Sequence, residues 1–260
     1  MKIGNWIDEI RCEKRFNESM RRYTTFHIGG KADIVIFPED VEDIRKILSV
    51  SRERDIPIFV LGGGANLLVK DGGIRGIVLS LRKGFRDIRI VDGTTVSVGV
   101  GAKIIEVVGF AGDNGLSGLE FAAGIPGSVG GALIMNAGAG GKEMAEVVES
   151  VTLMNQEGDI LNMVGDDIGF GYRYSRFPSG SILLMARLSL KEGDKREIKE
   201  KMEVNLEERK KREPISFPSA GSIFKNPVGD FAGRLIESAG LKGYRIGDAQ
   251  VSEKHANFIV

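Results

Sequence analysis

Cysteine and histidine are scarce in this sequence of 260 residues, which limits the kinds of site it can contain. The single cysteine, Cys12, excludes an internal disulfide framework and fits a reducing compartment. The two histidines, His27 and His255, lie far apart along the chain, and neither a CxxC nor an HExxH motif is present. Because zinc needs several nitrogen or sulfur ligands, these absences argue against a metal site.

The sequence also lacks an excess of charge of either sign and lacks a long apolar run. Its 36 basic and 36 acidic side chains balance, so bulk electrostatics predict no nucleic-acid or membrane-surface partner. Asp8 and Glu9 interrupt the stretch where a signal peptide needs an apolar core, and no apolar run is long enough to cross a bilayer. We therefore expect a soluble, cytoplasmic protein.

Glycine, in contrast, is concentrated in two stretches, VLGGGANLLV (residues 60–69) and GIPGSVGGALIMNAGAGG (residues 124–141). Dense glycine persists where the backbone adopts positive φ or closely approaches another group, and bare amides can donate hydrogen bonds to anionic oxygens. Such a stretch can also form tight turns between packed strands, and for one stretch alone the two interpretations are about equal. The presence of two stretches favours one extended ligand that is flat and carries phosphate.

Neither stretch matches a standard nucleotide motif. The glycines at 62–64 fail the dinucleotide fingerprint, because Leu67 stands where its third glycine should be. A P-loop is excluded because Glu143 follows Lys142 and because Asn136 replaces the upstream glycine.

The N-terminal part predicts a small α/β unit. Apolar residues recur at helical spacing from Val41 to Leu48, after Asp40, which can cap the helix. A strand over 34–37 precedes this helix, and strands over 56–61 and 76–81 follow it. The first glycine stretch begins at the carboxyl end of the 56–61 strand, the usual place for a ligand in open α/β sheets.

The rest of the chain predicts a β-rich part and a C-terminal part. The β-rich part has hairpins around 92–93 and 157–158, a helix over 103–113 and a strand over 182–190. The C-terminal part has a charged linking helix over 193–212, a helix over 230–238 and a strand at HANFIV (255–260). We expect an α+β fold with domains 1–82, 83–192 and 193–260.

Two residues outside the glycine stretches are candidates for a role in catalysis or in binding an anion. Ser222 lies close to Lys225 and Asn226, and this combination can bind an anion and pass a proton, although a turn serine with a surface lysine is the simpler interpretation. Arg173 lies between tyrosines in GYRYSRF (171–177), where it can clamp a carboxylate in a bidentate manner. The alternative for Arg173 is stacking on those tyrosines at a strand edge.

Six motifs in order resemble the UDP-N-acetylenolpyruvoylglucosamine reductases, bacterial flavoenzymes of peptidoglycan precursor synthesis, and cover nearly the whole chain. They are TTFHIGGKAD (24–33), VLGGGANLLV (60–69), GLSGLEFAAGIPGSVGGALIMNAGAGG (115–141), GYRYSRF (171–177), PSAGSIFKNP (218–227) and VSEKHANFIV (251–260). The resemblance implies an FAD-binding domain of the vanillyl-alcohol oxidase type in two subdomains, followed by a C-terminal α/β substrate-binding domain.

The resemblance also implies roles for residues. Noncovalent FAD would be bound by Gly62, Gly63, Gly64, Ala65, Asn66 and Leu67 around its pyrophosphate, and by Gly124, Gly127, Ser128, Gly130 and Gly131 on the other side of the flavin. The substrate, UDP-N-acetylglucosamine enolpyruvate, would be bound by Tyr172, Lys225, Asn226 and His255. Arg173 would correspond to the catalytic arginine and Ser222 to the proton donor.

The implied reaction uses NADPH as cosubstrate and passes its hydride through the flavin to the enolpyruvyl group, giving UDP-N-acetylmuramate. Arg173 would stabilise the negative charge that develops in the transition state. Ser222 would then protonate the adjacent carbon, assisted by Lys225 or a neighbouring donor because serine is a weak acid.

One feature departs from the family pattern. In the family, a helix and a strand bearing a catalytic glutamate follow HANFIV, whereas this sequence stops at Val260. We expect either a shortened chain or another carboxylate, such as Glu237 or Glu253, in its place. One alternative function is therefore an FAD-binding protein with little or no turnover. The other is a related flavin-dependent oxidase, against which PSAGSIFKNP argues.

Overall fold

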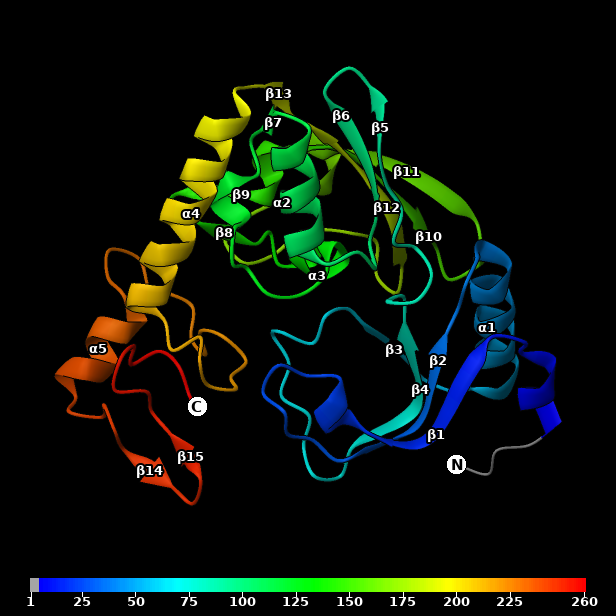
Figure 1. Cartoon of the computed structure of the whole chain (residues 1–260). Helices are drawn as coiled ribbons and strands as arrows, with labels where there is room; N and C mark the ends of the chain where they lie inside the picture. Colours follow the sequence, from blue (N-terminus) through cyan, green and yellow to red (C-terminus); the bar gives the residue numbers. More distant parts are fainter. Residues whose placement is uncertain (1–4) are drawn as a thin grey trace.

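A computed structural model describes residues 5–260 and contains two main sheets and a smaller C-terminal part (Figure 1). The strands are β1 (Glu13–Ser19), β2 (Lys31–Phe37), β3 (Ile58–Leu61), β4 (Ile74–Ser80), β5 (Ile88–Asp92), β6 (Thr95–Gly99), β7 (Leu116–Ser117), β8 (Gly138–Ala139), β9 (Lys142–Glu143), β10 (Val148–Met154), β11 (Ile160–Val164), β12 (Ile182–Ser189), β13 (Lys191–Glu192), β14 (Arg245–Ile246) and β15 (Ala249–Gln250). The α-helices are α1 (Val41–Arg54), α2 (Ile104–Asp113), α3 (Val129–Ile134), α4 (Lys195–Arg212) and α5 (Ala232–Ser238). Short 3-10 helices lie at Asn5–Glu9, Met20–Arg22, Glu120–Ala122, Met144–Glu146 and Gly165–Ile168.

The first sheet has the strand order β1-β2-β4-β3. Strands β2, β4 and β3 are parallel, and β1 pairs antiparallel with β2 at the edge. Helix α1 packs on one face of this sheet, where Ile44 and Ile47 are fully buried in the same cluster as Ile34 and Leu79. The Oδ1 of Asp40 accepts a hydrogen bond from the N–H of Asp43 at 2.9 Å, which confirms the predicted helix cap.

The opposite face of the first sheet has a separate apolar cluster, and we call it the loop-covered face. Its strand residues include Val35, Phe37 and Val78, and they pack with Met20 and Tyr23 from the segment that follows β1. Leu61, at the end of β3, and Val69, the last residue of the first glycine stretch, belong to the same cluster. The buried side chain of Val69 therefore holds the connection between β3 and β4 against this face.

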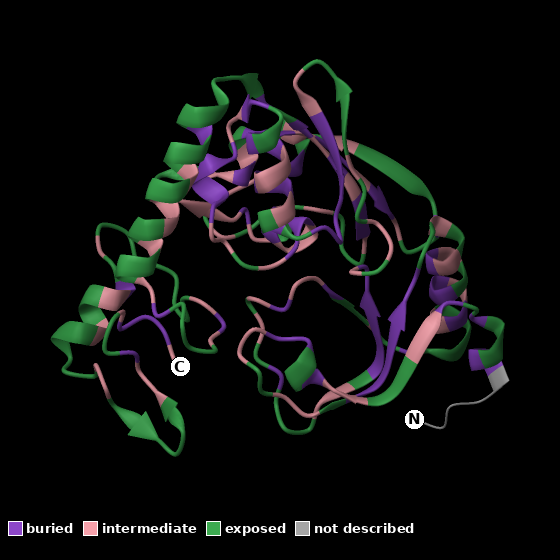
Figure 2. Cartoon of the chain, viewed as in Figure 1, coloured by how far each residue is buried: buried purple, intermediate pink, exposed green. Residues whose placement is uncertain are grey.

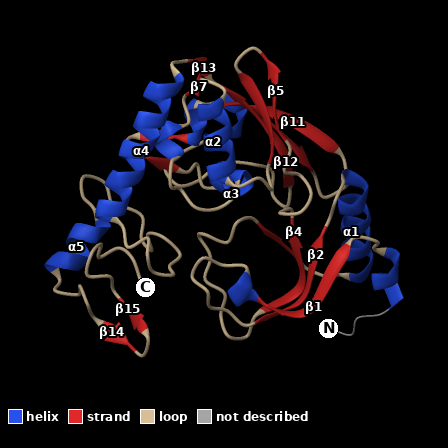
Figure 3. Cartoon of the chain, in the orientation of Figure 1, coloured by secondary structure: helices blue, strands red, loops and turns tan. Residues whose placement is uncertain are grey.

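The second sheet has the order β11-β10-β12-β6-β5 and is antiparallel throughout. The Asp92-Gly93 hairpin is confirmed as β5 and β6, and the Glu157-Gly158 hairpin as β10 and β11. Helix α3 contacts β6 and β12 of this sheet. One continuous buried cluster includes residues of both sheets, and Figure 3 shows the two groups of strands lying close together on one side of the molecule.

The C-terminal part begins with the long helix α4, which is mostly exposed (Figure 2). Asp194 caps its first turn, because its Oδ1 accepts from the N–H of Arg196 at 2.8 Å. Farther along, the Nδ2 of Asn205 donates to the carbonyl oxygen of Glu120 at 2.9 Å, which fastens α4 to the β-rich part. Within the described residues, no helix is long and apolar enough to cross a membrane.

The predicted strand at HANFIV is wrong. Phe258 and Ile259 form only isolated bridges, to Ser222 and Val251 respectively. Just before them, the side chain of Asn257 pairs with the backbone of Phe224, donating to its carbonyl at 2.8 Å and accepting from its N–H at 3.0 Å. Residues 255–258 form a turn, in which the N–H of Phe258 donates to the carbonyl of His255 at 3.0 Å, so a regular strand does not form.

Candidate functional site

The two glycine stretches meet in space. The first glycine loop (residues 62–67) follows β3, and the second glycine loop (residues 124–131) leads into α3. The N–H of Gly63 donates to the Oγ of Ser128 at 3.1 Å, and the N–H of Gly131 approaches the same oxygen at 3.4 Å. Ser128 therefore caps α3 and also joins the two loops.

The close approach of the two loops requires glycine at position 63. A Cβ on Gly63 would lie 2.7 Å from the N of Ser128 and closer still to the Cα of Gly127. Gly64 has φ of +70°, and a Cβ there would strike the carbonyl oxygen of Tyr23. The backbone of the first loop is therefore packed directly against neighbouring backbone on both sides.

The second glycine loop is anchored to the start of the β-rich part. The N–H of Val129 donates to the carbonyl of Ala102, and that of Gly130 to Val100, each at 2.9 Å. The carbonyl of Gly127 accepts from the N–H of Ile104 at 3.1 Å. A site built on this loop is thus held by the segment that joins β6 to α2 and by the first residue of α2, which favours a fixed geometry.

Arg173 lies in a tight turn, residues 171–174, which we call the arginine turn. Gly171 and Tyr174 exchange backbone hydrogen bonds of 3.0 and 3.2 Å, and Arg173 between them has φ of +61°. Such a conformation is strained for a non-glycine residue and persists only where the surroundings impose it. The Nδ2 of Asn136, a residue of the second glycine stretch, donates to the carbonyl of Gly171 at 3.2 Å and holds the turn.

The arginine turn adjoins the segment that carries Ser222, residues 218–227, which we call the serine segment. The hydroxyl of Tyr172 accepts from the N–H of Asn226 at 3.3 Å, and the Nζ of Lys225 lies 5.8 Å from the ring centroid of Tyr174. The guanidinium of Arg173 lies over the ring of Tyr172 at 5.6 Å. The structure therefore brings the two predicted catalytic segments together.

The serine segment also reaches the first glycine loop. The Oγ1 of Thr25 donates to the carbonyl of Ser219 at 2.7 Å, although 194 residues separate them. A Cβ on Gly221 would come within 3.9 Å of the carbonyl oxygen of Ala65. Ser222 itself is exposed, and its backbone is bridged to Phe258. Thr25 lies in a motif that the sequence analysis quoted, but nothing in the sequence pattern assigned it this contact.

Two of the predicted substrate residues, Asn226 and His255, accept hydrogen bonds from neighbouring backbone. The Oδ1 of Asn226 accepts from the N–H of Ala232 at 3.1 Å, at the first residue of α5. His255 is half-buried, and its Nδ1 accepts from the N–H of Asn257 at 3.2 Å, which assigns the proton of the neutral ring to Nε2. Burial lowers the pKa of His255, and the charge of Glu213 acts in the opposite direction.

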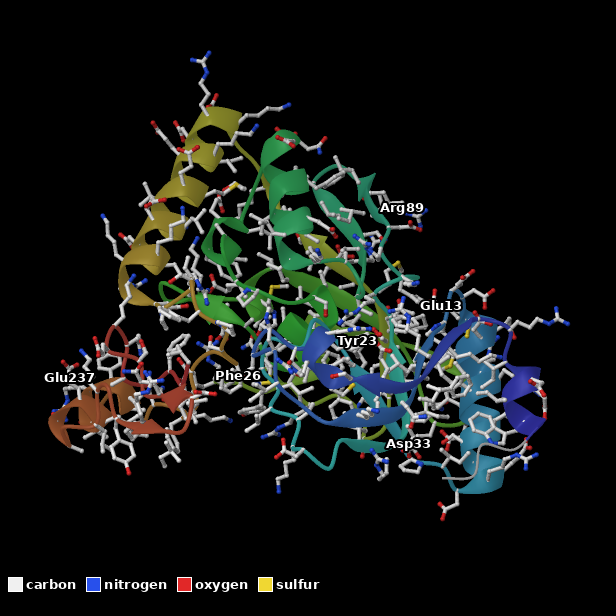
Figure 4. The ribbon with its side chains drawn as sticks, turned by 60° about the horizontal axis from the view of Figure 1, so that its bottom comes forward. Glu13, Tyr23, Phe26, Asp33, Arg89 and Glu237 are labelled. Atoms are coloured by element: carbon white, nitrogen blue, oxygen red, sulfur yellow. The ribbon has the colours of Figure 1, made fainter. Side chains whose placement is uncertain are left out.

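The two carboxylates considered as substitutes lie elsewhere in the C-terminal part. Glu237 forms an ion pair of 2.7 Å with Lys242, and Figure 4 shows it at the outer edge of the molecule. Glu253 lies against residue 243, where an added Cβ would be 3.4 Å from its Oε1. Among the residues described, no group of three histidine, cysteine or acidic side chains could hold a metal ion.

The two loops fit the diphosphate of FAD. Neither glycine stretch contains an acidic side chain that would repel an anion. The glycines at 62–64 leave the backbone of the first loop free of side chains, so that amides not bonded to Ser128 can donate to an anion. The arginine turn and the serine segment border the same loops, so they can face a substrate that lies on the flavin.

Comparisons with known proteins agree with this geometry. Residues 32–163 match the family model of an FAD binding domain, and residues 213–260 match that of the UDP-N-acetylenolpyruvoylglucosamine reductase C-terminal domain. The UDP-N-acetylenolpyruvoylglucosamine reductase of Desulforamulus reducens is 47% identical over 252 residues, which are 96% of this chain and 83% of the relative. That of Clostridium tetani is 44% identical over 260 residues, 99% of this chain and 84% of the relative.

Solved structures give the same result for the fold. The crystal structure of the UDP-N-acetylenolpyruvylglucosamine reductase of Thermus caldophilus has a TM-score of 0.83 and 40% identity, covering 96% of this chain and 88% of that one. The expected FAD-binding architecture of the vanillyl-alcohol oxidase type, followed by the family's C-terminal domain, is confirmed. The chain belongs to the UDP-N-acetylenolpyruvoylglucosamine reductase family of FAD-dependent oxidoreductases.

Proposed function

We propose that this protein uses NADPH to reduce UDP-N-acetylglucosamine enolpyruvate to UDP-N-acetylmuramate, in the cytoplasm, as a step of peptidoglycan precursor synthesis. The names of its relatives support the reaction. The observation that carries the proposal is the contact of the arginine turn with the serine segment beside both glycine loops. We assign cofactor binding to residues 1–192, divided near residue 82, and substrate binding to residues 193–260.

Noncovalent FAD would be held by the two glycine loops. Gly62, Gly63, Gly64, Ala65, Asn66 and Leu67 would surround its diphosphate, and Gly124, Gly127, Ser128, Gly130 and Gly131 would lie along the flavin. When bound, FAD supplies hydride transfer between NADPH and the enolpyruvyl group. The contribution of the protein is to hold the loops in one arrangement and to keep acidic side chains away from the phosphates.

Arg173 would stabilise the negative charge that develops on the substrate carboxylate and its neighbouring carbon. A guanidinium is always charged and can donate two parallel hydrogen bonds to a carboxylate. The strained backbone of Arg173 and the Tyr172 ring beneath its guanidinium hold the cation before substrate arrives, so little reorganisation is needed during the reaction. Tyr172 would also contact the substrate.

Ser222 would donate the proton that completes the reduction. Its exposure leaves the hydroxyl accessible to a ligand, and its backbone is held by the bridge to Phe258. The ammonium of Lys225, in the same segment, would make the hydroxyl a better acid and would bind the UDP phosphates. Asn226 and His255 would position the substrate-binding surface through their contacts with Ala232 and Asn257.

The test is anaerobic steady-state turnover with NADPH and UDP-N-acetylglucosamine enolpyruvate, with the product identified by mass. We expect NADPH oxidation that depends on the substrate, together with a product two hydrogens heavier. Bound FAD without such turnover would instead support the FAD-binding alternative. Oxygen consumption with simple alcohols would support the flavin-dependent oxidase.

A further inference from the structure

The serine segment is held by contacts of two kinds. Inside the C-terminal part, the backbone of Ser222 is bridged to Phe258, and the side chain of Asn257 pairs with the backbone of Phe224. These contacts fix the shape of the segment. They do not fix its place beside the glycine loops, because every partner belongs to the C-terminal part itself. That place has to come from contacts with earlier parts of the chain.

Across residues 5–260, two hydrogen bonds join the serine segment to residues before 193. One runs from the N–H of Asn226 to the hydroxyl of Tyr172 at 3.3 Å, and it leads to the arginine turn. The other runs from the Oγ1 of Thr25 to the carbonyl of Ser219 at 2.7 Å, and it leads to the segment between β1 and β2. Thr25 therefore supplies the hydrogen bond that ties the serine segment to the part of the chain that contains the first sheet.

Thr25 is also bonded to the first glycine loop. Its N–H donates to the carbonyl of Gly64 at 3.1 Å. One residue thus holds the first glycine loop with its backbone and the serine segment with its side chain. Beside this link the two segments run close together, because a Cβ on Gly221 would come within 3.9 Å of the carbonyl oxygen of Ala65.

The turn that carries Thr25 is itself fixed. Tyr23 and Thr24 are buried, and Tyr23 belongs to the apolar cluster of the loop-covered face. The Oγ1 of Thr24 donates to the carbonyl of Ile28 at 3.1 Å and closes the turn. Figure 4 shows Phe26, the residue after Thr25, on the side of the first sheet that lies toward the C-terminal part. A hydroxyl on a fixed turn can hold the segment that it bonds in one position.

We propose that Thr25 is a positioning residue for substrate reduction: its hydroxyl holds the serine segment at one place beside the first glycine loop, and so sets where the hydroxyl of Ser222 meets the substrate. The inference rests on the proposed function, and it adds a residue that acts through Ser222 and not on the substrate. A proton donor must be placed accurately, since a misplacement of about 1 Å can slow a reaction about a hundredfold.

The experiment follows single turnovers of the full chain loaded with FAD, first its reduction by NADPH and then its anaerobic reoxidation by saturating UDP-N-acetylglucosamine enolpyruvate. Thr25→Val removes the hydroxyl but keeps the branched shape and the backbone bond to Gly64. Reoxidation should slow by about ten- to a hundredfold, while reduction by NADPH should stay within about twofold of wild type. Thr25→Ser keeps the donor and should recover most of the reoxidation rate.

Thr25→Ala is the second variant without the donor. It places no methyl group beside the carbonyl of Ser219, so it tests the same bond if valine does not fit there. It should slow reoxidation as Thr25→Val does. Thr152→Val is the matched control, because it removes a threonine hydroxyl that bonds Asn162 in the second sheet, and it should change neither half-reaction.

A double variant separates positioning from a general effect on structure. In Ser222→Ala the proton donor is already absent, so adding Thr25→Val should slow reoxidation by less than about twofold more. A full multiplication of the two losses would overturn the positioning role. So would equal slowing of both half-reactions, a wild-type reoxidation rate in Thr25→Val and Thr25→Ala, or no recovery in Thr25→Ser, and each of these would leave the proposed function intact. A wild-type chain that NADPH reduces and the substrate does not reoxidise would overturn the proposed function, and this inference with it.

Discussion

The N–H of Gly63 and the Oγ of Ser128 form a hydrogen bond of 3.1 Å across 65 residues of sequence. This bond makes the two glycine loops one unit, because the same oxygen also caps helix α3. A change in either loop therefore acts on both, and their arrangement is sensitive to any side chain that separates them.

Gly63→Val should abolish FAD binding and lower stability. A branched side chain at 63 would collide with the backbone of Gly127 and Ser128, and overpacking of this kind costs about 1–3 kcal/mol. Gly72→Val is the control, since a Cβ at Gly72 meets nothing within 4 Å. Flavin absorbance of the purified protein and thermal unfolding measure the two effects. Normal flavin content in Gly63→Val would show that the loops need not touch.

Arg173→Gly should separate catalysis from stability. Glycine relieves the positive-φ strain of about 1 kcal/mol, but it also adds about 0.5–1 kcal/mol of unfolded-state entropy. The free energy of unfolding should therefore change little. Turnover with the enolpyruvyl substrate should fall by about 10²–10³ if the cation stabilises the transition state.

Arg173→Lys is the companion variant, because it keeps the positive charge at this position. We expect it to recover part of the turnover without restoring bidentate contact with a carboxylate. Wild-type turnover in Arg173→Gly would remove the arginine from the reaction and leave it a stacking residue on Tyr172.

Ser222→Ala should affect the two half-reactions unequally. NADPH should still bleach the flavin absorbance, because in the proposed mechanism the hydroxyl acts only when the substrate is protonated. Anaerobic recovery of that absorbance on adding substrate should slow by about 10²–10⁴, the usual contribution of a positioned proton donor. Ser222→Cys should be faster than Ser222→Ala. Equal slowing of both half-reactions would assign Ser222 to structure or flavin binding.

His255 should make stability depend on pH. Burial lowers its pKa below the ordinary 6.5, Arg212 and Lys242 act in the same direction, and Glu213 opposes them. The unfolded chain therefore binds a proton more readily, so stability is full above pH 7 and decreases as the pH falls through 6.5 toward the lowered value. Urea unfolding of wild type and His255→Gln between pH 7.5 and 5 measures this. A slope that is the same in both proteins would assign the pH dependence to other groups.

The sequence was sufficient to predict those helices and hairpins that are determined by residues within one short segment. Asp40 with the apolar spacing of α1, and the Asp-Gly pair between β5 and β6, predicted elements that the structure confirms. Strand β1 was missed, because EKRFNES is an edge strand with a polar pattern and has no apolar run to identify it. The strand at HANFIV was wrong because residues 255–258 form a turn, in which the N–H of Phe258 donates to the carbonyl of His255 at 3.0 Å, and the apolar pattern does not reveal this turn.

The candidate site was predictable only as separate motifs. The composition of the glycine stretches indicated close backbone contact, but not that Ser128 would be the atom that joins them. The contact of Tyr172 with Asn226 and that of Thr25 with Ser219 depend on how distant segments fold together.

The bridge between Ser222 and Phe258 also sets an order of events during synthesis on the ribosome. Every residue that joins the two glycine loops has been translated by Gly131, whereas Ser222 gains its backbone partner only when Phe258 emerges. Chains generally fold in units from the N-terminus as they are made. A nascent chain can therefore join its two glycine loops more than a hundred residues before Ser222 gains its backbone partner.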